Sequence, residues 1–508
     1  MNKGKKSILN AIVGLVQMLV TCLIGLVFNR IILENFGSSA NGINATVSQI
    51  VNAIMIVEGG FTLASNVALF EPWGKGDVDR INGILSATKK RFDVIGWLAV
   101  AIGLLIAFVY PFTVNSEMSY FEIVALMLTA LLPMCYNLGV TTKYRVVLLT
   151  EQKEYIMSLI SLITYVIGMI AAIVGALFFN ISLVAARCFI MLSLFAGYIG
   201  VAIYCKKNFP FISFRAKPQY DAIKGTKSVI AMKLTSVLYT SAPIIIISML
   251  PAGGFVLASV YAVYNSIMSV VNSGLCAVVN APRLGLGALF AENDKKSLTR
   301  VYSQYEAISF MGLSVILGTT ALLILPFVSV YTQGIEDADY IDELMAILLI
   351  SKNFFEILHI PCGQMIQMSG RFKAANRIQI VACVVLAIIL TTGFILANLY
   401  VIIFAVAFAA MVLCVFEVIY SEKNILHRGW LLFIRNMLPA TVICIACTVL
   451  GMTNFIRCKN IFEFIVFGGI TFFLICAITV TSFFIVNRQT TKGILNFVLR
   501  NTIKRKEI

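Results

Sequence analysis

Lys352, Glu356 and His359 are the residues of this chain whose types and spacing most directly suggest chemistry. They follow one another at about one helical turn within the apolar segment 342–367. Oppositely charged side chains four residues apart on a helix can form an ion pair. Ionisable residues inside a membrane helix are costly to bury and are candidates for a transport pathway. Two interpretations stay open: a self-compensating Lys–Glu pair, and a titratable pair in a transport cavity with His359 as proton acceptor.

Four further ionisable residues within apolar segments are candidates for function. Arg30, Arg187 and Lys233 are candidates for a binding site, and the alternative is that their long side chains extend to the nearer membrane interface. Glu58 directly precedes Gly59-Gly60. Together with Glu356 and His359, it is a candidate for coupling to H⁺ or Na⁺. The alternative for Glu58 is a buried carboxyl that is protonated and hydrogen-bonded.

Polar side chains, mostly amides and hydroxyls, form a stripe on each of two apolar segments. With 100° per residue, the polar residues of segment 43–70 fall within about 120° of arc. They are Asn44, Ser48, Asn52, Glu58, Thr62 and Asn66, and segment 255–282 has Asn265, Ser269, Asn272 and Asn280 in a similar pattern. Polar faces of this length do not face lipid. They indicate either hydrogen bonds between helices or the wall of a hydrated, sugar-compatible cavity.

The elements that position these residues are predicted to be membrane-spanning helices. The 508 residues are 60% hydrophobic and only 12% charged, and apolar runs recur from end to end. Runs of 18 or more apolar residues can cross a bilayer as a helix. The sequence therefore predicts an all-α polytopic membrane protein with 14 transmembrane helices. The expected spans are 7–33, 43–70, 92–113, 120–142, 156–178, 181–204, 227–250, 255–282, 307–331, 342–367, 377–397, 399–421, 436–455 and 461–486.

The basic residues predict the orientation of these spans. The net charge is +15, and most of the 39 Lys and Arg residues fall in alternate connecting segments, whereas the opposite side has Arg457 and Lys459. Cytoplasmic loops of membrane proteins collect Lys and Arg. We therefore expect both termini in the cytoplasm, and this rule accounts for the positive charge without a nucleic-acid partner.

An internal repeat predicts two similar halves. At a constant offset, Val51-Asn52 recurs as Val271-Asn272, Ala68-Leu69-Phe70 as Ala288-Leu289-Phe290, and Arg80 as Arg300. Parallel repeats of this kind are common in transporters, around a central site. We expect two pseudo-symmetric six-helix lobes, 1–210 and 211–425, facing each other across a cavity. Residues 426–508 would add a C-terminal helical hairpin and a cytoplasmic amphipathic tail.

Enzyme motifs are absent from the sequence. It contains no phosphate-binding glycine loop and no HExxH, and His359 and His427 are its only histidines. The 12 cysteines are scattered, mostly in apolar runs, and the CxxC of Cys444 and Cys447 lies within an expected span. Such cysteines behave as small buried hydrophobes. We predict that the protein is not an enzyme and has neither a metal site nor a cofactor.

Short motifs in a fixed order carry a family resemblance over most of residues 20–380. They are Arg30 with Gly37, Glu58-Gly59-Gly60, Ala68-Leu69-Phe70, Asp79-Arg80-Ile81, Tyr144-Arg145-Val146-Val147-Leu148-Leu149, Lys153-Glu154-Tyr155, Lys206, Pro210, Ile244-Ile245-Ile246-Ile247-Ser248, Tyr261-Ala262-Val263-Tyr264 and Gly370-Arg371-Phe372-Lys373. With them the chain resembles a polysaccharide flippase of the Wzx type. That family belongs to the multidrug/oligosaccharidyl-lipid/polysaccharide exporter superfamily, with lipid II flippases and multidrug-and-toxin extrusion transporters.

The resemblance implies a function and a location. The implied cargo is an undecaprenyl-diphosphate-linked oligosaccharide, moved by alternating access from the inner to the outer leaflet of the bacterial cytoplasmic membrane for surface polysaccharide synthesis. Polysaccharide polymerase and chain-length machinery are candidate partners. Arg30, Lys233, Lys352 and Arg187 would then attract the diphosphate. The residues that would contact sugar are Asn44, Ser48, Asn52, Asn265 and Asn272.

One departure and two alternatives accompany this resemblance. Where many relatives have an acid before the Ile-rich run, this chain has Ser241-Ala242-Pro243, so a coupling acid is absent or moved to Glu58 or Glu356. The first alternative is a cation-coupled multidrug-and-toxin extruder. Against it, the first span has no acid and the candidate interior is more basic than acidic. The second is a membrane-embedded transferase acting on the same lipid, for which no catalytic acid or histidine cluster is evident.

Overall fold

The computed structural model is all-helical and describes residues 3–116, 118–222, 235–280, 295–453, 455–488, 490–491 and 493. The chain divides into two compact units, Met1–Val260 and Tyr261–Ile508. The helices of the first unit are α1 (Lys3–Lys75), α2 (Val78–Val109), α3 (Tyr120–Tyr136), α4 (Thr142–Thr150), α5 (Glu154–Phe179), α6 (Leu183–Asn208) and α8 (Ala242–Ser248). Helix α9 (Gly254–Asn280) begins in the first unit and continues into the second.

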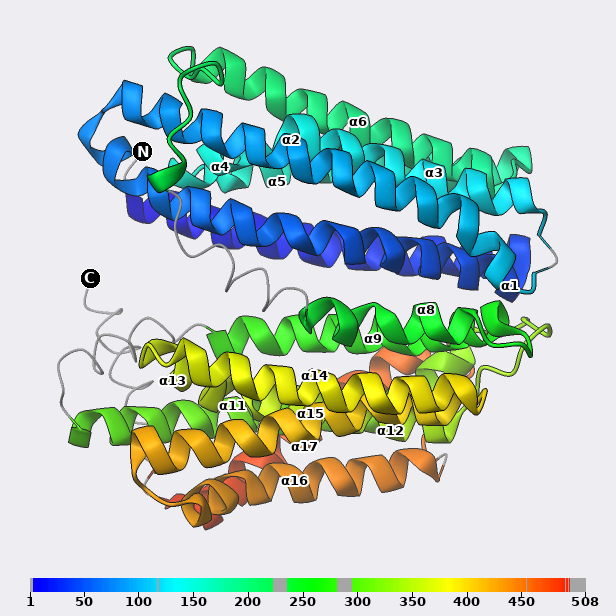
Figure 1. The fold of residues 1–508 in the computed structure, drawn as a ribbon. Helices are drawn as coiled ribbons and strands as arrows, with labels where there is room; N and C mark the ends of the chain where they lie inside the picture. Colours follow the sequence, from blue (N-terminus) through cyan, green and yellow to red (C-terminus); the bar gives the residue numbers. More distant parts are fainter. Residues whose placement is uncertain are drawn as a thin grey trace. The chain divides into compact units, whose positions relative to one another are not determined.

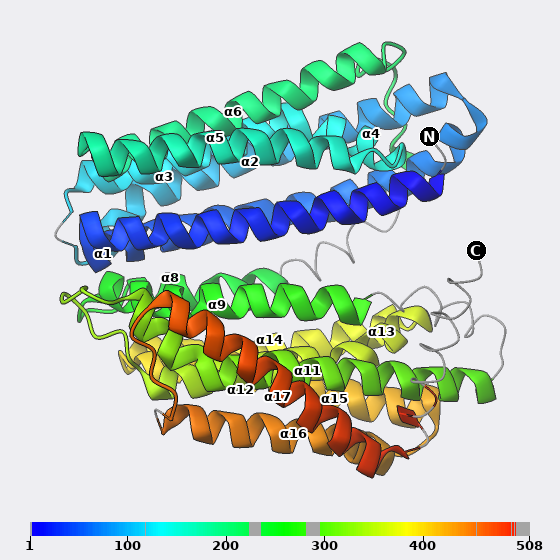
Figure 2. The same ribbon diagram turned by 180° about the vertical axis from the view of Figure 1, so that it is seen from behind.

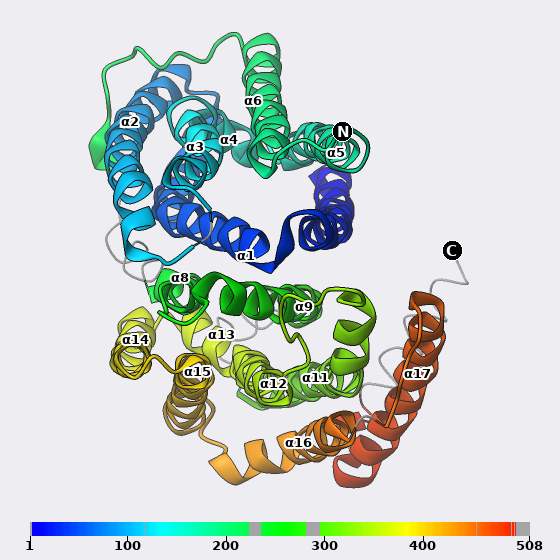
Figure 3. The ribbon, with the colours of Figure 1, turned by 90° about the vertical axis from the view of Figure 1, so that its right-hand side faces the viewer.

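A glycine divides α1 into two arms. Gly37 has φ 80° and ψ 173°, a conformation outside the helical range. Glycine adopts positive φ without the steric cost that a Cβ would add. The two arms therefore run back along each other, which Figure 1 and Figure 3 show as the two blue helices of α1. The predicted spans 7–33 and 43–70 are these two arms.

Local sequence signals set several other helix ends. Ser119 and Glu122 form a reciprocal capping box at the start of α3. Asn180, with φ 46°, ends α5, and the hydroxyl of Ser182 accepts a hydrogen bond from the Ala185 amide at the start of α6. Side-chain oxygens at such positions satisfy backbone amides that have no partner within the helix. The tight turn between α5 and α6 follows from these residues.

The helices of the first unit form a closed ring. Around the ring, α1 packs on α2, α2 on α3, α3 on α6, α6 on α5, and α5 again on α1 (Figure 3). A core that includes Phe28, Ile43, Leu126 and Ile190 fills it, and Phe255 from the start of α9 joins that core. Burial of these side chains from α1, α3, α6 and α9 holds together helices that are far apart in sequence.

A glutamate between α4 and α5 joins both ends of α1 by hydrogen bonds and ion pairs. Glu151 accepts hydrogen bonds from Lys6 Nζ at 2.7 Å and from Trp73 Nε1 at 2.9 Å, and Lys153 Nζ lies 3.7 Å away. Lys6 and Trp73 lie near opposite ends of α1, so the turn at Gly37 brings both to one end of the unit. Burial alone would raise the pKa of the Glu151 carboxyl, but these hydrogen bonds and the charges of Lys6 and Lys153 outweigh it and hold that pKa below its ordinary value.

Glu151→Gln is expected to destabilise the protein at neutral pH by about 1–2 kcal/mol, as for other charged hydrogen bonds. The pKa of Glu151 is lower in the folded protein than in the unfolded chain, where it is about 4.3. The stability that Glu151 contributes is therefore complete above the unfolded pKa and is lost as the pH falls through the folded pKa. The thermal unfolding midpoints of wild type and variant should therefore converge once the pH is below both pKa values. Glu71→Gln, which removes an exposed pair with Lys75, is the control and should leave the midpoint nearly unchanged. A difference that persists unchanged at low pH would contradict this prediction.

The second unit repeats the order of the first and adds a hairpin (Figure 2). Its further helices are α11 (Lys295–Tyr331), α12 (Glu343–Leu358), α13 (Ile360–Met368), α14 (Phe372–Ile395), α15 (Leu399–Ser421), α16 (Trp430–Met452) and α17 (Ile461–Val486). In both units a long helix is followed by an interrupted one. A π-helical segment (Asn137–Thr141) separates α3 from α4, and a break at His359 separates α12 from α13. Two long helices then follow, α5 and α6 or α14 and α15, and α16 and α17 come after the repeat.

The predicted number of 14 spans is not confirmed. Twelve helices among the described residues are long and apolar enough to cross a membrane. One of them belongs to α1, whose two arms correspond to two expected spans. The first part of the expected span 227–250 lies outside the described residues, and its described part is helical with a turn at Ser241. The predicted boundaries at residues 210 and 425 remain predictions.

Candidate functional site

The charged residues predicted on 342–367 come together with an amide from α9. Lys352 Nζ lies 3.6 Å from Glu356 Oε2 on α12, and the side chains are only 11% and 16% exposed. The amide of Asn272 on α9 donates to the same Glu356 oxygen at 3.3 Å. An opposite charge and an amide partly compensate the cost of burying the carboxylate. Three predicted site residues thus form one cluster, which we call the α12 cluster: Lys352, Glu356 and Asn272.

His359 lies at the break between α12 and α13. Pro361 is in the first turn of α13 and lacks the backbone N–H that a continuous helix would use. His359 Nδ1 is 2.9 Å from Glu417 Oε2 on α15, a distance typical of a charge-assisted hydrogen bond. The imidazole is therefore positioned by a carboxylate one turn beyond the α12 cluster.

Glu417 is a further candidate for the site, because it contacts His359, and it is not among the candidates predicted from sequence. It is the only acid within 399–421, and that isolation is a signal that could have identified it. Its side chain is 5% exposed. A Cβ added to Gly363 would collide with the Glu417 carboxylate, so the absence of a side chain at 363 lets this acid approach α13.

In the first unit, Arg187 and Ser48 come together. Arg187 Nη2 on α6 donates to Ser48 Oγ at 3.2 Å, and that hydroxyl donates to the Asn44 carbonyl at 2.9 Å. Asn44 is buried, and its side-chain Oδ1 has no hydrogen-bond partner among the described residues. Arg30 instead pairs with Glu34 on the same arm of α1, with Nη2 2.6 Å from Oε1. The predicted stripe thus contains a cation–hydroxyl contact and a buried amide oxygen.

The remaining predicted residues are at least partly exposed, or they lie outside the described residues. Asn52 is exposed and Asn265 is half-buried. Lys233 and the side chains of Glu58 and Asn280 lie outside the described residues. Within the described part of the chain, no three His, Cys, Asp or Glu side chains are grouped so that they could hold a metal ion.

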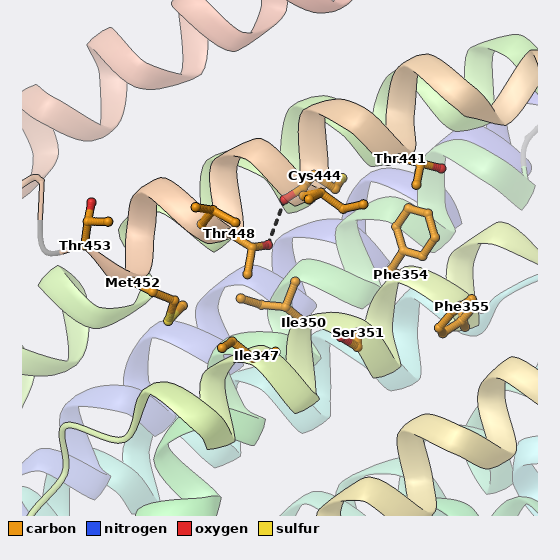
Figure 4. Close-up of a pocket in the computed structure, with 12 residues that line it drawn as sticks. Ile347, Ile350, Ser351, Phe354, Phe355, Thr441, Cys444, Thr448, Met452 and Thr453 are labelled. Carbon is orange, nitrogen blue, oxygen red and sulfur yellow. Dashed lines mark hydrogen bonds between the residues drawn. The ribbon is translucent and has the colours of Figure 1, made fainter.

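An apolar groove lies along another face of α12. It has a volume of about 660 Å³ and runs between α12 and α16. Figure 4 shows Ile347, Ile350 and Ser351 of α12 on one side and Thr448 and Met452 of α16 on the other. The Thr448 hydroxyl is satisfied by the Cys444 carbonyl at 2.7 Å, so it adds little polarity to the groove. Sequence gave no signal for this groove, because its residues are ordinary components of apolar spans.

Helix α12 therefore has two chemically different sides. Lys352 and Glu356 meet α9 on one of them, and Ile347 and Ile350 line the groove toward α16 on the other. A helix arranged in this way can contact a charged group and a hydrocarbon chain at once. The chemistry of the described residues suits the binding of an amphiphile.

Comparisons with known proteins identify the fold. No protein-family model matches the chain, and no curated protein matches it in sequence. It is similar to the solved structure of the lipid II flippase MurJ in an inward closed conformation, with a TM-score of 0.70 and 13% identity over 94% of this chain and 99% of that one. It is also similar to an inward-facing multidrug resistance MATE family transporter of the MOP superfamily, with a TM-score of 0.60 and 14% identity over 82% of this chain and 98% of that one. A third similar structure is the MATE multidrug transporter DinF-BH, with a TM-score of 0.57 and 15% identity over 84% of this chain and 98% of that one. The protein is thus a multi-pass membrane protein with the fold of MOP superfamily transporters, and these structural neighbours are transporters.

Proposed function

We propose that this protein is a flippase that moves an undecaprenyl-diphosphate-linked oligosaccharide from the inner to the outer leaflet by alternating access. The observation that carries the proposal is the two-sided helix α12. Its ion pair is buried beside α9, and its apolar groove faces α16. A lipid-linked saccharide likewise has a charged and polar part, its anionic head and sugars, and an apolar part, its long hydrocarbon tail.

The head group needs cations and hydrogen-bonding groups away from bulk water. Lys352 supplies a cation in the second unit, and Arg187 supplies one beside Ser48 and Asn44 in the first. The Oδ1 of Asn44, which has no hydrogen-bond partner among the described residues, can accept a hydrogen bond from a sugar hydroxyl. A buried acceptor without a partner costs free energy, and a ligand that donates to it removes that cost. We assign diphosphate binding to the cations and sugar binding to the amides. Lys233 and Arg30 are further candidates for the first role, and Asn52 and Asn265 for the second.

The hydrocarbon tail fits the groove between α12 and α16. Helix α16 belongs to the hairpin that follows the repeated helices, so the groove requires this addition. The match to the lipid II flippase covers 94% of this chain and the match to the inward-facing MATE transporter 82%. The more complete match is to a protein named for a lipid substrate, and this supports a lipid-linked cargo.

The acids of the second unit support one alternative. Glu356, Glu417 and His359 could take up H⁺ or Na⁺, as expected of a cation-coupled multidrug extruder with this fold. In the proposed flippase, the same residues and Glu58 would couple lipid movement to an ion gradient. We place the protein in the bacterial cytoplasmic membrane with both termini inside, where polysaccharide polymerase and chain-length machinery would be its partners.

The test is a flipping assay with the full chain in phosphatidylcholine vesicles. They would contain a polyprenyl-diphosphate oligosaccharide with a fluorophore on the sugar, and a membrane-impermeant reductant would bleach the outer leaflet. Protein-containing vesicles should lose the protected inner-leaflet signal that protein-free vesicles keep. If the signal stays protected while the same vesicles accumulate a cationic dye against an ion gradient, the protein is a multidrug extruder instead.

A tryptophan placed in the groove should slow this flipping. Ile445→Trp places an indole in space that the tail would occupy, and a steric cost of about 1–3 kcal/mol to the bound tail corresponds to roughly a tenfold lower rate. Ile470→Trp on α17 is the matched control, because Ile445 is 59% exposed and Ile470 is 58% exposed, and only Ile445 lines the groove. Equal rates for the two variants would exclude the groove as the path of the tail.

A further inference from the structure

A basic cavity lies in the first unit, apart from the site described above. Its volume is about 500 Å³, and its lining comes from α2, from α4 and from the end of α6 with the segment that follows. Four cations line it: Lys89, Lys143, Lys206 and Arg215. No carboxylate is among its lining residues. Asp93, one turn from Lys89, acts on Lys143 electrostatically without lining the cavity.

The wall of this cavity is held in place by hydrogen bonds to α2. The Asn82 side chain donates to the Phe211 carbonyl at 3.1 Å and accepts from the Ser213 amide at 2.8 Å. The Gln219 amide donates to the Gly83 carbonyl at 3.0 Å. Phe214 packs edge-on against Tyr144 with ring centroids 5.3 Å apart. The chain after α6 is thus fixed over α2 and α4, and the cations face a preformed hollow.

One of the cations is also held in position. Lys143 Nζ donates to the Gly139 carbonyl at 3.3 Å and lies 5.6 Å from the Tyr144 ring centroid and 5.4 Å from that of Phe214. Contacts of this kind stabilise an ammonium group over aromatic faces. They do not neutralise it, so a half-enclosed site with four positive charges and no lining acid favours an anion.

The volume of the cavity and its apolar lining residues indicate which class of anion it binds. About 500 Å³ is far more than a single inorganic ion fills, and Phe209, Ile212 and Phe214 lie beside the cations. Lys and Arg complement phosphate, and apolar side chains complement the glycerol and first methylenes of a lipid. We infer that this cavity binds the phosphate-bearing head group of an anionic phospholipid. The inference does not depend on the cargo proposed above, because no residue of the α12 cluster takes part.

The experiment measures lipid-dependent stabilisation of the full-length protein in detergent. Phosphatidylglycerol, phosphatidylcholine and inorganic phosphate are titrated at matched ionic strength, and the thermal unfolding midpoint is followed. Wild type should be stabilised by phosphatidylglycerol and much less by phosphatidylcholine. Lys89→Gln/Lys206→Gln removes two lining charges and should lower the apparent affinity for phosphatidylglycerol by roughly 10- to 30-fold, from about 1 kcal/mol per charge.

The neighbouring lysines provide a matched control. Lys90→Gln/Lys207→Gln removes the same number of charges one residue further along α2 and α6, and neither residue lines the cavity. The control should retain the wild-type affinity. Equal losses in the two double variants, or no loss in Lys89→Gln/Lys206→Gln, would overturn the inference. A full shift with inorganic phosphate, to which the lipid adds nothing, would assign the cavity to a free anion and also overturn it.

Discussion

Lys352→Met is expected to lower flipping by roughly 30-fold or more while the protein still folds. Truncation of one partner of a buried charge pair costs about 2–5 kcal/mol, and the variant also lacks the cation that we assign to the diphosphate. Methionine keeps most of the side-chain volume, so the buried position of residue 352 stays filled. The measurement is the initial rate of the vesicle assay, with monodispersity on size-exclusion chromatography as the test of folding.

A double variant separates a structural ion pair from a binding site. Lys352→Met/Glu356→Gln removes both charges of the pair and keeps the hydrogen bond that Asn272 can donate to residue 356. Stability should recover, because no buried charge is left uncompensated. Flipping should stay low, because the cation is still missing. Recovery of flipping in the double variant would show that the pair serves only the fold.

An exposed lysine supplies the control for Lys352. Lys373, in the first turn of α14, is exposed. Lys373→Met removes the same charge from the second unit and should leave the flipping rate near that of wild type. A comparable loss in this variant would point to net charge and would refute the assignment to Lys352.

Arg428→Ala is expected to be the most destabilising single substitution on the described chain, at about 3–5 kcal/mol. Arg428 Nη2 lies 2.6 Å from both Glu306 and Glu422, its Nη1 donates to Ser303 at 3.0 Å, and these three charged side chains are 5% exposed or less. The Asn436 amide donates to Glu306 at 2.6 Å. One guanidinium thus joins α11 to the end of α15 and the start of α16. Its removal leaves two buried carboxylates without their cation.

The thermal unfolding midpoint in detergent checks this prediction. Arg435→Ala on α16 is the control, because Arg435 is exposed, and it should change the midpoint little. Addition of Glu306→Gln and Glu422→Gln to Arg428→Ala should restore much of the lost thermal stability, since burial of a neutral amide costs less free energy than burial of an unpaired carboxylate. An unchanged midpoint in Arg428→Ala would mean that the cluster does not hold α16 in place.

The positions of most helices could be predicted from hydropathy alone. The expected spans 399–421 and 461–486 coincide with α15 and α17. Gly37 was expected in a connection between two spans, and it is where the two arms of α1 turn. The pair of Lys352 and Glu356 also follows from sequence, because helical geometry places residues i and i+4 side by side. Predictions of this kind depend on neighbours within one helix.

Residues that meet across helices were harder to predict. Arg428 lies between the expected spans 399–421 and 436–455, where the sequence does not distinguish it from other basic residues of connecting segments. The positive φ of His427 and Gly429 turns the chain so that Arg428 is buried against α11. Glu417 stood alone in its span, and its partner His359 lies 58 residues away. Pairing at such separation depends on which helix faces lie against each other, and local sequence does not contain that information.

Hydropathy and residue spacing are enough to predict a helical membrane protein with an internal repeat and to locate several of the costly charges within its apolar spans. These features follow from hydrophobicity and from helical periodicity, which act along the chain. The packing of the helices sets which charges are paired across helices, where the groove between α12 and α16 opens, and that four cations line one cavity. Each of these depends on distances between side chains of different helices, and packing sets those distances.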